Sequence, residues 1–116
     1  MSGPKPYPLR TGADAVRVVD RVRATRAGNV GFLCDLFHLA NNGDDVDAAI
    51  ANHADRVAHV QIADAPGRGE PGSGDLPLDR WLGELERSGY AGFVGLEYKP
   101  TTTTEASLAW LPVERR

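Results

Sequence analysis

Cysteine is nearly absent from this 116-residue sequence: Cys34 is the only one, so an internal disulfide is excluded and a reducing compartment is favoured. Long apolar runs are also missing, since no stretch approaches the roughly 20 apolar residues that a membrane helix needs. The first ten residues hold three prolines and no apolar segment of the kind found in secretory signals. These absences predict a cytoplasmic protein that makes no use of a membrane.

A strong positive charge is absent as well. The formal net charge is −3, and the basic residues are spread along the chain. Their closest approach to a cluster, residues 17–26, is interrupted by Asp20 and is typical of the solvent-exposed face of a helix. Because nucleic acids and anionic membranes are attracted by basic surfaces, we expect neither as a partner.

The apolar residues that are present alternate between helical and strand-like segments. Helix signals occur over residues 11–26, 44–56, 76–89 and 101–111. A dense apolar run at 29–40 predicts a strand that is buried on both faces, 57–63 predicts a second buried strand and 92–98 a third strand. No hairpin signal joins any two of them. This order predicts one α/β domain over residues 1–116, with a parallel sheet and helical crossovers.

The first helix carries recognisable end signals. Thr11 is placed to cap its N-terminus, Asp14 completes a capping box three residues later, and Gly28 is expected to end it. The apolar stripe expected to face the core consists of Ala15, Val18, Val19 and Val22.

A polar side chain with an oxygen ligand ends each predicted strand. Asp35 ends the first strand, Gln61 the second and Glu97 the third. Because sites in parallel α/β folds lie at the carboxyl ends of the strands, we expect these three to converge. Two carboxylates and an amide suit a hard divalent cation such as Mg²⁺ or Mn²⁺. The alternatives are structural: Asp35 as a helix N-cap or turn residue, and Gln61 as a partner for loop backbone.

Four further side chains lie near these strand ends. His38 follows Asp35 by three residues and is expected in the loop above the strand, and Lys99 stands two residues beyond Glu97. Arg68 lies in a glycine-rich loop that can approach an anionic ligand. Alternatively, Arg68 pairs with Glu70 or Asp64. His59 shares a strand face with Gln61 and is either a substrate contact or a hydrogen-bonded core residue.

Three segments together resemble a known family. They are "CDLFH" (residues 34–38), "HVQIADAPGRGEPGSGD" (59–75) and "GLEYKPTTTTEASLAWL" (95–111). In these motifs the sequence is similar to the hydroxypyruvate isomerases, a branch of the xylose isomerase-like barrels that also include ketose 3-epimerases. The resemblance runs from Pro6 to Leu111.

The resemblance implies a (β/α)₈ barrel and a metal-assisted reaction without a redox cofactor. Asp35, Gln61 and Glu97 match the family's divalent-metal ligands, and Glu97 also matches one of two glutamates that carry protons between neighbouring substrate carbons. His38 and Arg68 match positions that contact substrate in related epimerases. The implied reaction interconverts hydroxypyruvate and 2-hydroxy-3-oxopropanoate, with Arg68 or Lys99 holding the substrate carboxylate.

The chain departs from this family in length. A barrel takes roughly 250 residues, so the resemblance implies a partial barrel that runs from about the fifth helix to the eighth and keeps three strands. The family's fifth strand brings the second glutamate, which is also the fourth metal ligand, and no strand ending in Glu precedes Thr11. We therefore expect a truncated gene product, the result of a misplaced start codon or one piece of a split barrel, with little turnover from the isolated chain.

Two other functions stay open. The first is a non-catalytic half barrel that acts by association, as a homo-oligomer or with a complementing N-terminal half, because open strand edges and an uncovered inner face favour contact. The second is a related ketose 3-epimerase acting on a sugar, although His often stands there in place of Gln61. A metal-dependent nuclease is poorly supported, because such sites use many histidines and a basic surface.

Overall fold

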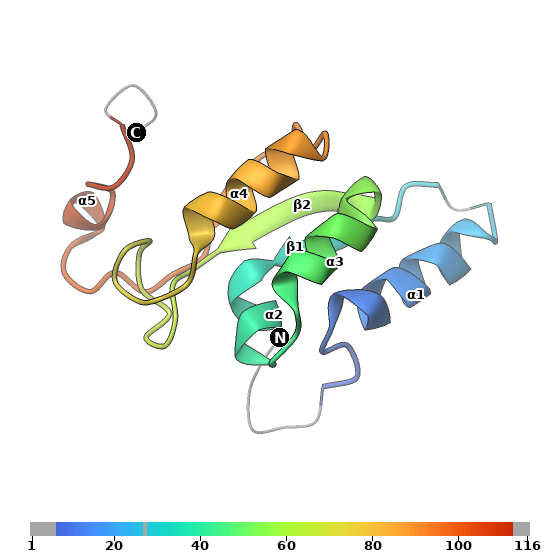
Figure 1. The fold of residues 1–116 in the computed structure, drawn as a ribbon, viewed down its shortest axis with the longest axis horizontal. Helices are drawn as coiled ribbons and strands as arrows, with labels where there is room; N and C mark the ends of the chain where they lie inside the picture. The colour runs from blue at the N-terminus through green and yellow to red at the C-terminus, as the bar shows by residue number, and fades with distance from the viewer. Residues whose placement is uncertain (1–6, 27, 113–116) are drawn as a thin grey trace.

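The computed structural model describes residues 7–26 and 28–112, in which helices and strands alternate along the chain (Figure 1). The strands are β1 (Phe32–Asp35), β2 (Val57–Ile62) and β3 (Val94–Leu96). The helices are α1 (Gly12–Arg23), α2 (Leu36–Asn41), α3 (Val46–His53), the short 3₁₀ helix η1 (Ala54–Arg56), α4 (Leu78–Arg87) and α5 (Thr104–Ser107).

The three strands form one parallel sheet in the order β1-β2-β3, which confirms the predicted α/β class and strand number. Asp35 pairs with Gln61 across the first two strands, and Gln61 pairs with Gly95 across the next two. Paired residues in a parallel sheet point to the same face. This register therefore fixes which side chains can meet at the sheet edge.

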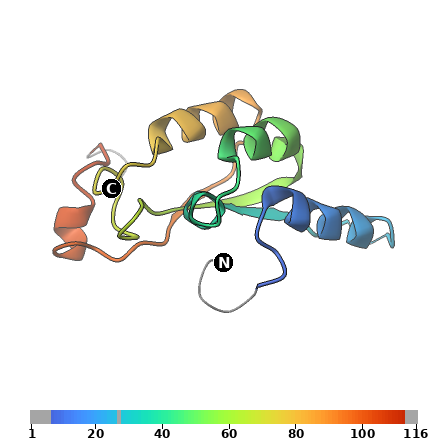
Figure 2. The same ribbon diagram turned by 60° about the horizontal axis from the view of Figure 1, so that its bottom comes forward.

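Helices cover one face of the sheet. Helices α3 and α4 lie over it, and α1 runs beside β1 (Figures 1 and 2). The strand residues that point towards these helices are buried, and they pack with apolar helix residues in one core. The core includes Val16, Val19, Phe32, Cys34, Val46, Ile50, Val60, Ile62, Leu78, Trp81 and Leu85. Over the described ranges, no helix covers the opposite face of the sheet (Figure 2).

Capping side chains explain where several helices begin. Thr11 and Asp14 form the predicted capping box of α1, with the Thr11 hydroxyl accepting the Asp14 N–H at 3.1 Å. Asp35, Asp45 and Thr103 each cap the helix that follows by accepting a backbone N–H. Of these caps, Asp35 lies at the end of β1, so it joins the end of this strand directly to the start of α2.

Three sequence-based predictions on the elements are wrong. Strand β1 is not buried on both faces, because Leu33 is 51% exposed. Over the described residues no helix covers that face (Figure 2), which agrees with the uncovered inner face expected of a partial barrel. Helix α1 ends at Arg23, before Gly28. Its core-facing side is formed by Val16 and Val19, whereas Val18 is 43% exposed.

None of the described helices is both long enough and apolar enough to pass through a membrane.

Candidate functional site

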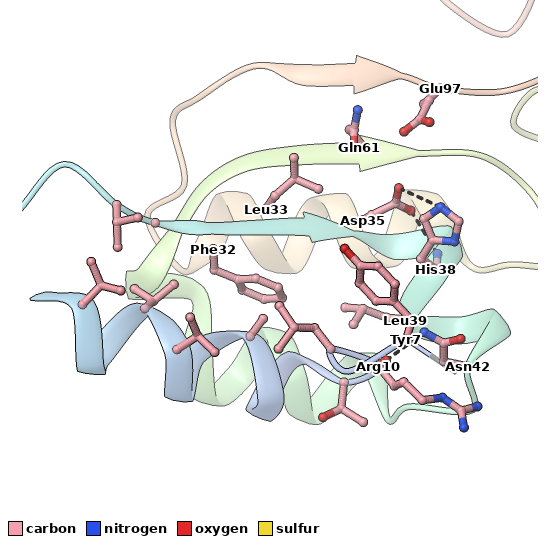
Figure 3. Close-up of a pocket in the computed structure, with 18 residues that line it drawn as sticks. Tyr7, Arg10, Phe32, Leu33, Asp35, His38, Leu39, Asn42, Gln61 and Glu97 are labelled. Atoms are coloured by element: carbon pink, nitrogen blue, oxygen red, sulfur yellow. Dashed lines mark hydrogen bonds and ion pairs between the residues drawn. The ribbon is translucent and has the colours of Figure 1, made fainter. Parts of the chain in front are cut away.

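The carboxyl ends of the strands bring three predicted site residues to one rim of the sheet. Asp35 and Gln61 are directly paired, so they share a face. Gly95 pairs with Gln61, and Glu97 follows it by two residues on the same face, with its N–H donating to the Ile62 carbonyl at 3.0 Å. In Figure 3 the three polar side chains lie at the ends of adjacent strands. The predicted placement of the three side chains on one face is confirmed, whereas their joint binding of a cation stays a prediction.

A cavity of about 490 Å³ opens at this rim, between the sheet and helix α1. Asp35, His38, Gln61 and Glu97 supply polar groups at one end of it (Figure 3). The remaining wall is mostly apolar and includes Leu9, Ala15, Val18, Val19, Val22, Val30, Phe32, Leu33 and Leu39. Such a combination, a largely apolar pocket with a few converging polar groups, is typical of small-molecule sites.

Asp35 serves two structural purposes at this rim. One carboxylate oxygen, Oδ1, caps helix α2 by accepting the His38 N–H at 3.0 Å. The other, Oδ2, lies 3.7 Å from the Nε2 atom of His38. The structural alternative foreseen for Asp35, a helix N-cap, is therefore correct, and Asp35 also lines the cavity.

His38 lies in helix α2 and is buried, so its predicted place in a loop is wrong. Burial lowers the pKa of His38 below its ordinary value, and the neighbouring Asp35 carboxylate opposes this shift only in part. The imidazole is therefore mainly neutral at pH 7 and can both donate and accept a hydrogen bond. Its ring meets Phe37 edge to face, with centroids 5.2 Å apart.

Arg68 pairs with Glu97, not with Glu70 or Asp64. Its Nη2 atom lies 2.6 Å from Glu97 Oε1, and its Nε donates to the Glu97 carbonyl at 3.4 Å. The guanidinium carbon also lies 5.4 Å from the centroid of the Phe37 ring, which is a cation–π contact. A charged donor is thus held directly beside the carboxylate that ends the third strand.

The loop that carries Arg68 is built around Asp64, a carboxylate that is only 1% exposed. Its Oδ1 atom accepts the N–H groups of Ala65 and Leu76 at 2.9 and 3.0 Å, and Oδ2 accepts that of Gly72 at 2.9 Å. Gly74 has to be glycine, because a Cβ there would lie 2.1 Å from the Ala65 carbonyl oxygen. The loop is therefore tightly organised around one buried acid.

His59 and Lys99 are less central. His59 is half-buried on the same sheet face as Gln61 and packs against Gly95, where an added Cβ would lie 2.9 Å from its Nε2 atom. Lys99 is exposed, and its backbone N–H donates to the Arg68 carbonyl at 2.8 Å. Neither side chain lines the cavity.

The donor set at the rim consists of oxygen atoms. In the part of the chain that the structure describes, no group of three His, Cys, Asp or Glu side chains is gathered closely enough to hold a metal by itself. A cation at this rim would depend on the Gln61 amide together with Asp35 and Glu97, and these are ligands that suit Mg²⁺ or Mn²⁺. Cys34 points to the core side of β1, and burial raises the pKa of its thiol to about 12.

Sequence reasoning missed several residues that shape the site. Phe37 lies under Arg68, Tyr7 lines the cavity from the N-terminal side, and Asp64 organises the loop. An acidic residue between a buried strand and a glycine-rich loop was a usable signal for Asp64, because such loops leave backbone N–H groups without partners. Nothing local in the sequence identifies Phe37, since its contact depends on how a distant loop folds.

Comparisons with known proteins agree with this architecture. The family described as xylose isomerase-like TIM barrel matches residues 1–113. A Streptomyces coelicolor relative is 52% identical over 112 residues, which cover 95% of this chain and 40% of the relative. That relative is named provisionally as a hydroxypyruvate isomerase. The Escherichia coli hydroxypyruvate isomerase is 39% identical over 84% of this chain and 36% of that enzyme.

A solved structure shares the fold. The apo form of the Escherichia coli 3-keto-D-glucoside 4-epimerase superposes with a TM-score of 0.77 at 29% identity, covering 90% of this chain and 40% of that one. This chain thus spans well under half the length of the relatives it matches, and its three parallel strands correspond to part of their barrel. The chain belongs to the xylose isomerase-like TIM barrel family.

Proposed function

We propose that this chain carries one part of the active site of a metal-assisted isomerase that interconverts hydroxypyruvate and 2-hydroxy-3-oxopropanoate. The observation that carries the proposal is the common rim of Asp35, Gln61 and Glu97 beside one cavity. The 52% identity to a relative with a hydroxypyruvate isomerase name supports the choice of reaction.

In this proposal Asp35, Gln61 and Glu97 hold a divalent cation, with Mg²⁺ or Mn²⁺ as the expected species. The fit is supported by the donor atoms, because two carboxylates and one amide are hard oxygen ligands and no thiol reaches the rim. A bound cation would polarise the substrate carbonyl and so acidify the neighbouring C–H group.

The chain's own residues account for proton transfer and orientation. The Glu97 carboxylate removes the proton from the hydroxymethyl carbon and a proton is returned to the former carbonyl carbon, while the hydroxyl proton moves to the former carbonyl oxygen. Arg68 lies 2.6 Å from Glu97, and its guanidinium has more N–H donors than its bonds to Glu97 use, so it can also bind the substrate carboxylate.

The remaining substrate contacts follow from position. The neutral imidazole of His38 lines the cavity and can hydrogen-bond a substrate hydroxyl or carbonyl. His59 and Lys99 lie farther from the cavity, and we assign them contacts at its edge. Substrates of this kind are small hydroxy-oxo acids, and the apolar part of the cavity excludes water from them.

The cytoplasmic location expected from the sequence stays a prediction.

Cation binding to the purified chain tests the proposal without needing turnover. Mn²⁺ should broaden the amide NMR signals around residues 35, 61 and 97 before any others, and Mg²⁺ should reverse the broadening. Glu97→Gln should weaken Mn²⁺ binding about tenfold, because one charged ligand is lost. Glu86→Gln, on the exposed surface of α4, is the matched control and should bind as the parent does. Equal affinity in the parent and both variants would refute the assigned ligands.

Turnover is the second test. Hydroxypyruvate isomerisation should be very slow with this chain alone, and in a full barrel that contains these residues Glu97→Gln should remove most of it. Unchanged turnover in that full-barrel variant would show that Glu97 is not the proton carrier. Coupled detection of 2-hydroxy-3-oxopropanoate, with and without Mg²⁺ or Mn²⁺, gives the rate.

A sugar epimerase is the second candidate activity. It is favoured by the likeness to the 3-keto-D-glucoside 4-epimerase structure and by a cavity of about 490 Å³, which has more room than a three-carbon acid needs. Competition of hydroxypyruvate and a ketose for the same NMR-detected site distinguishes the two, since tighter ketose binding favours the epimerase.

Association is the third candidate and comes from the exposed apolar surface. Phe93 is 88% exposed, and Leu33, Val94 and Leu96 are also exposed, while β1 and β3 each leave one strand edge open within the described sheet. Such surfaces favour pairing with another chain. Sedimentation across concentration tests homo-oligomers, and co-expression with an N-terminal half barrel of the same family tests complementation. A monomer under both conditions would exclude this candidate.

A further inference from the structure

Two loops at the rim are joined by a side chain that the proposed reaction does not use. Glu70 belongs to the loop after β2, and Thr101 to the segment after β3. The Glu70 carboxylate accepts two hydrogen bonds, one from the Thr101 N–H at 3.0 Å and one from the Thr101 hydroxyl. Both bonds lower the pKa of Glu70. The Gly69 backbone also lies close to the Thr101 side chain, because a Cβ on Gly69 would lie 3.2 Å from the Thr101 methyl group.

Arg68, two residues before Glu70, has an unusual backbone. Its φ is 57°, in the left-handed region that a side-chain-bearing residue rarely adopts. Two backbone hydrogen bonds hold this conformation. The Arg68 carbonyl accepts the Lys99 N–H at 2.8 Å, and the carbonyl of the next residue, Gly69, accepts the Asp64 N–H at 2.9 Å. A residue other than glycine keeps a left-handed backbone conformation where several surrounding contacts hold it, and such residues often lie at functional sites.

This backbone sets the direction of the Arg68 side chain. The guanidinium meets Glu97 at 2.6 Å and lies over Phe37 at 5.4 Å. Phe37 belongs to α2 and Glu97 follows β3, so the guanidinium touches the elements that follow the first and third strands. A change in the backbone at Arg68 would move the charge away from both.

We propose that Glu70 and Thr101 form a positioning pair that aims Arg68 at the rim, and that Arg68 so held sets the affinity for the carboxylate group of the substrate. The second half of this inference rests on the proposed function. None of Glu70, Thr101 and Arg68 lines the cavity, but Arg68 contacts Glu97, which does, so the pair acts on the rim through Arg68. Because a hydrogen bond to a charged group is stronger than a neutral one, a single carboxylate is sufficient to join the two loops.

The test measures Arg68 directly, in the chain without ligand. Arginine labelled with ¹³C and ¹⁵N reports rotation about the Nε–Cζ bond, which is slow when the guanidinium is held, and Arg68→Lys identifies the signal. In the parent chain we expect slow rotation at Arg68. Thr101→Val and Glu70→Ala should each accelerate it at least about tenfold. Thr101→Ser, which keeps the hydroxyl, should restore the slow rate.

Thr102→Val is the matched control, because Thr102 is the exposed neighbour of Thr101. It should leave the Arg68 signal unchanged. The inference is overturned if Arg68 rotates fast in the parent chain, or if it stays slow in both Thr101→Val and Glu70→Ala. It is also overturned if these variants lose the amide protection of the Asp64–Gly69 bridge, because the pair would then build the loop instead of aiming one residue of it.

Titration with hydroxypyruvate separates this inference from the proposed function. If the parent binds hydroxypyruvate, Thr101→Val should bind it more weakly by about tenfold, whereas Thr101→Ser and Thr102→Val should match the parent. Equal binding by Thr101→Val would overturn the link to affinity. Another outcome is that no form binds hydroxypyruvate, although Arg68 rotates slowly in the parent. That result would count against the proposed substrate and against the link between Arg68 and substrate affinity, and it would leave the positioning of Arg68 established.

Discussion

Replacing Asp64 by Asn should destabilise this chain more than its loop location suggests. Asp64 is buried, and its two oxygens accept three backbone N–H groups from three places in the loop after β2. Asparagine has nearly the same shape, so the change removes an acceptor and a charge without creating a cavity.

The size of the effect follows from those three hydrogen bonds. The asparagine side chain offers one acceptor oxygen, which can keep the bonds to Ala65 and Leu76, while its amide NH₂ then faces the Gly72 N–H, donor against donor. One bond to a charged group, about 1.5–3 kcal/mol, is lost, and the other two fall to the strength of neutral bonds, about 1 kcal/mol less each. We expect a loss of about 3–5 kcal/mol in the free energy of unfolding, a large share of the stability of a small domain.

Urea unfolding followed by circular dichroism measures this change. Asp75→Asn is the matched control, because Asp75 lies in the same loop and is exposed, and it should change stability by less than about 0.5 kcal/mol. A stability of Asp64→Asn within that same margin would refute the idea that one buried acid organises the loop. An unchanged m-value is required for the comparison, since the slope reports the surface exposed on unfolding.

Two further predictions test the capping and the core. Thr11→Ala should lower the free energy of unfolding by about 1 kcal/mol, because the capping box with Asp14 is lost. Thr11→Ser keeps the hydroxyl and should lower it little. Equal losses for the two variants in urea unfolding would argue against the cap. The Cys34 thiol is 0% exposed, and burial raises its pKa to about 12, so it should react with a thiol reagent at pH 8 only as fast as the protein unfolds. Rapid labelling of the native protein would show that β1 is open to solvent.

The rim of the sheet was predictable because strand geometry is regular. Apolar runs located the strands, and alternation along each strand placed Asp35, Gln61 and Glu97 at comparable depths. In a parallel sheet the carboxyl ends of all strands meet at one edge, so three separate local signals combine into one spatial prediction. The capping box of α1 was predictable for the same reason, since it depends on residues only three apart.

The partners of long side chains were not predictable in this way. Arg68 had acidic neighbours in its own loop, yet it pairs with Glu97, 29 residues farther along the chain. That choice depends on the left-handed backbone at Arg68 and on contacts between two loops. The prediction that β1 is buried on both faces failed for a related reason. An apolar run shows that a strand is suited to burial, but it does not show which elements are present to cover each of its faces.

Asp35 shows how one residue can serve the fold and the proposed site together. Its Oδ1 atom caps α2, which fixes the side-chain rotamer and leaves Oδ2 directed at the rim near His38. A ligand held in this way needs little reorganisation when a cation binds. Asparagine caps helices about as well as aspartate, so Asp35→Asn should keep the free energy of unfolding within about 1 kcal/mol while weakening Mn²⁺ binding. If stability and Mn²⁺ affinity instead fall together in urea unfolding and Mn²⁺ titrations, the carboxylate is needed for the fold itself, and its assignment as a ligand loses this support.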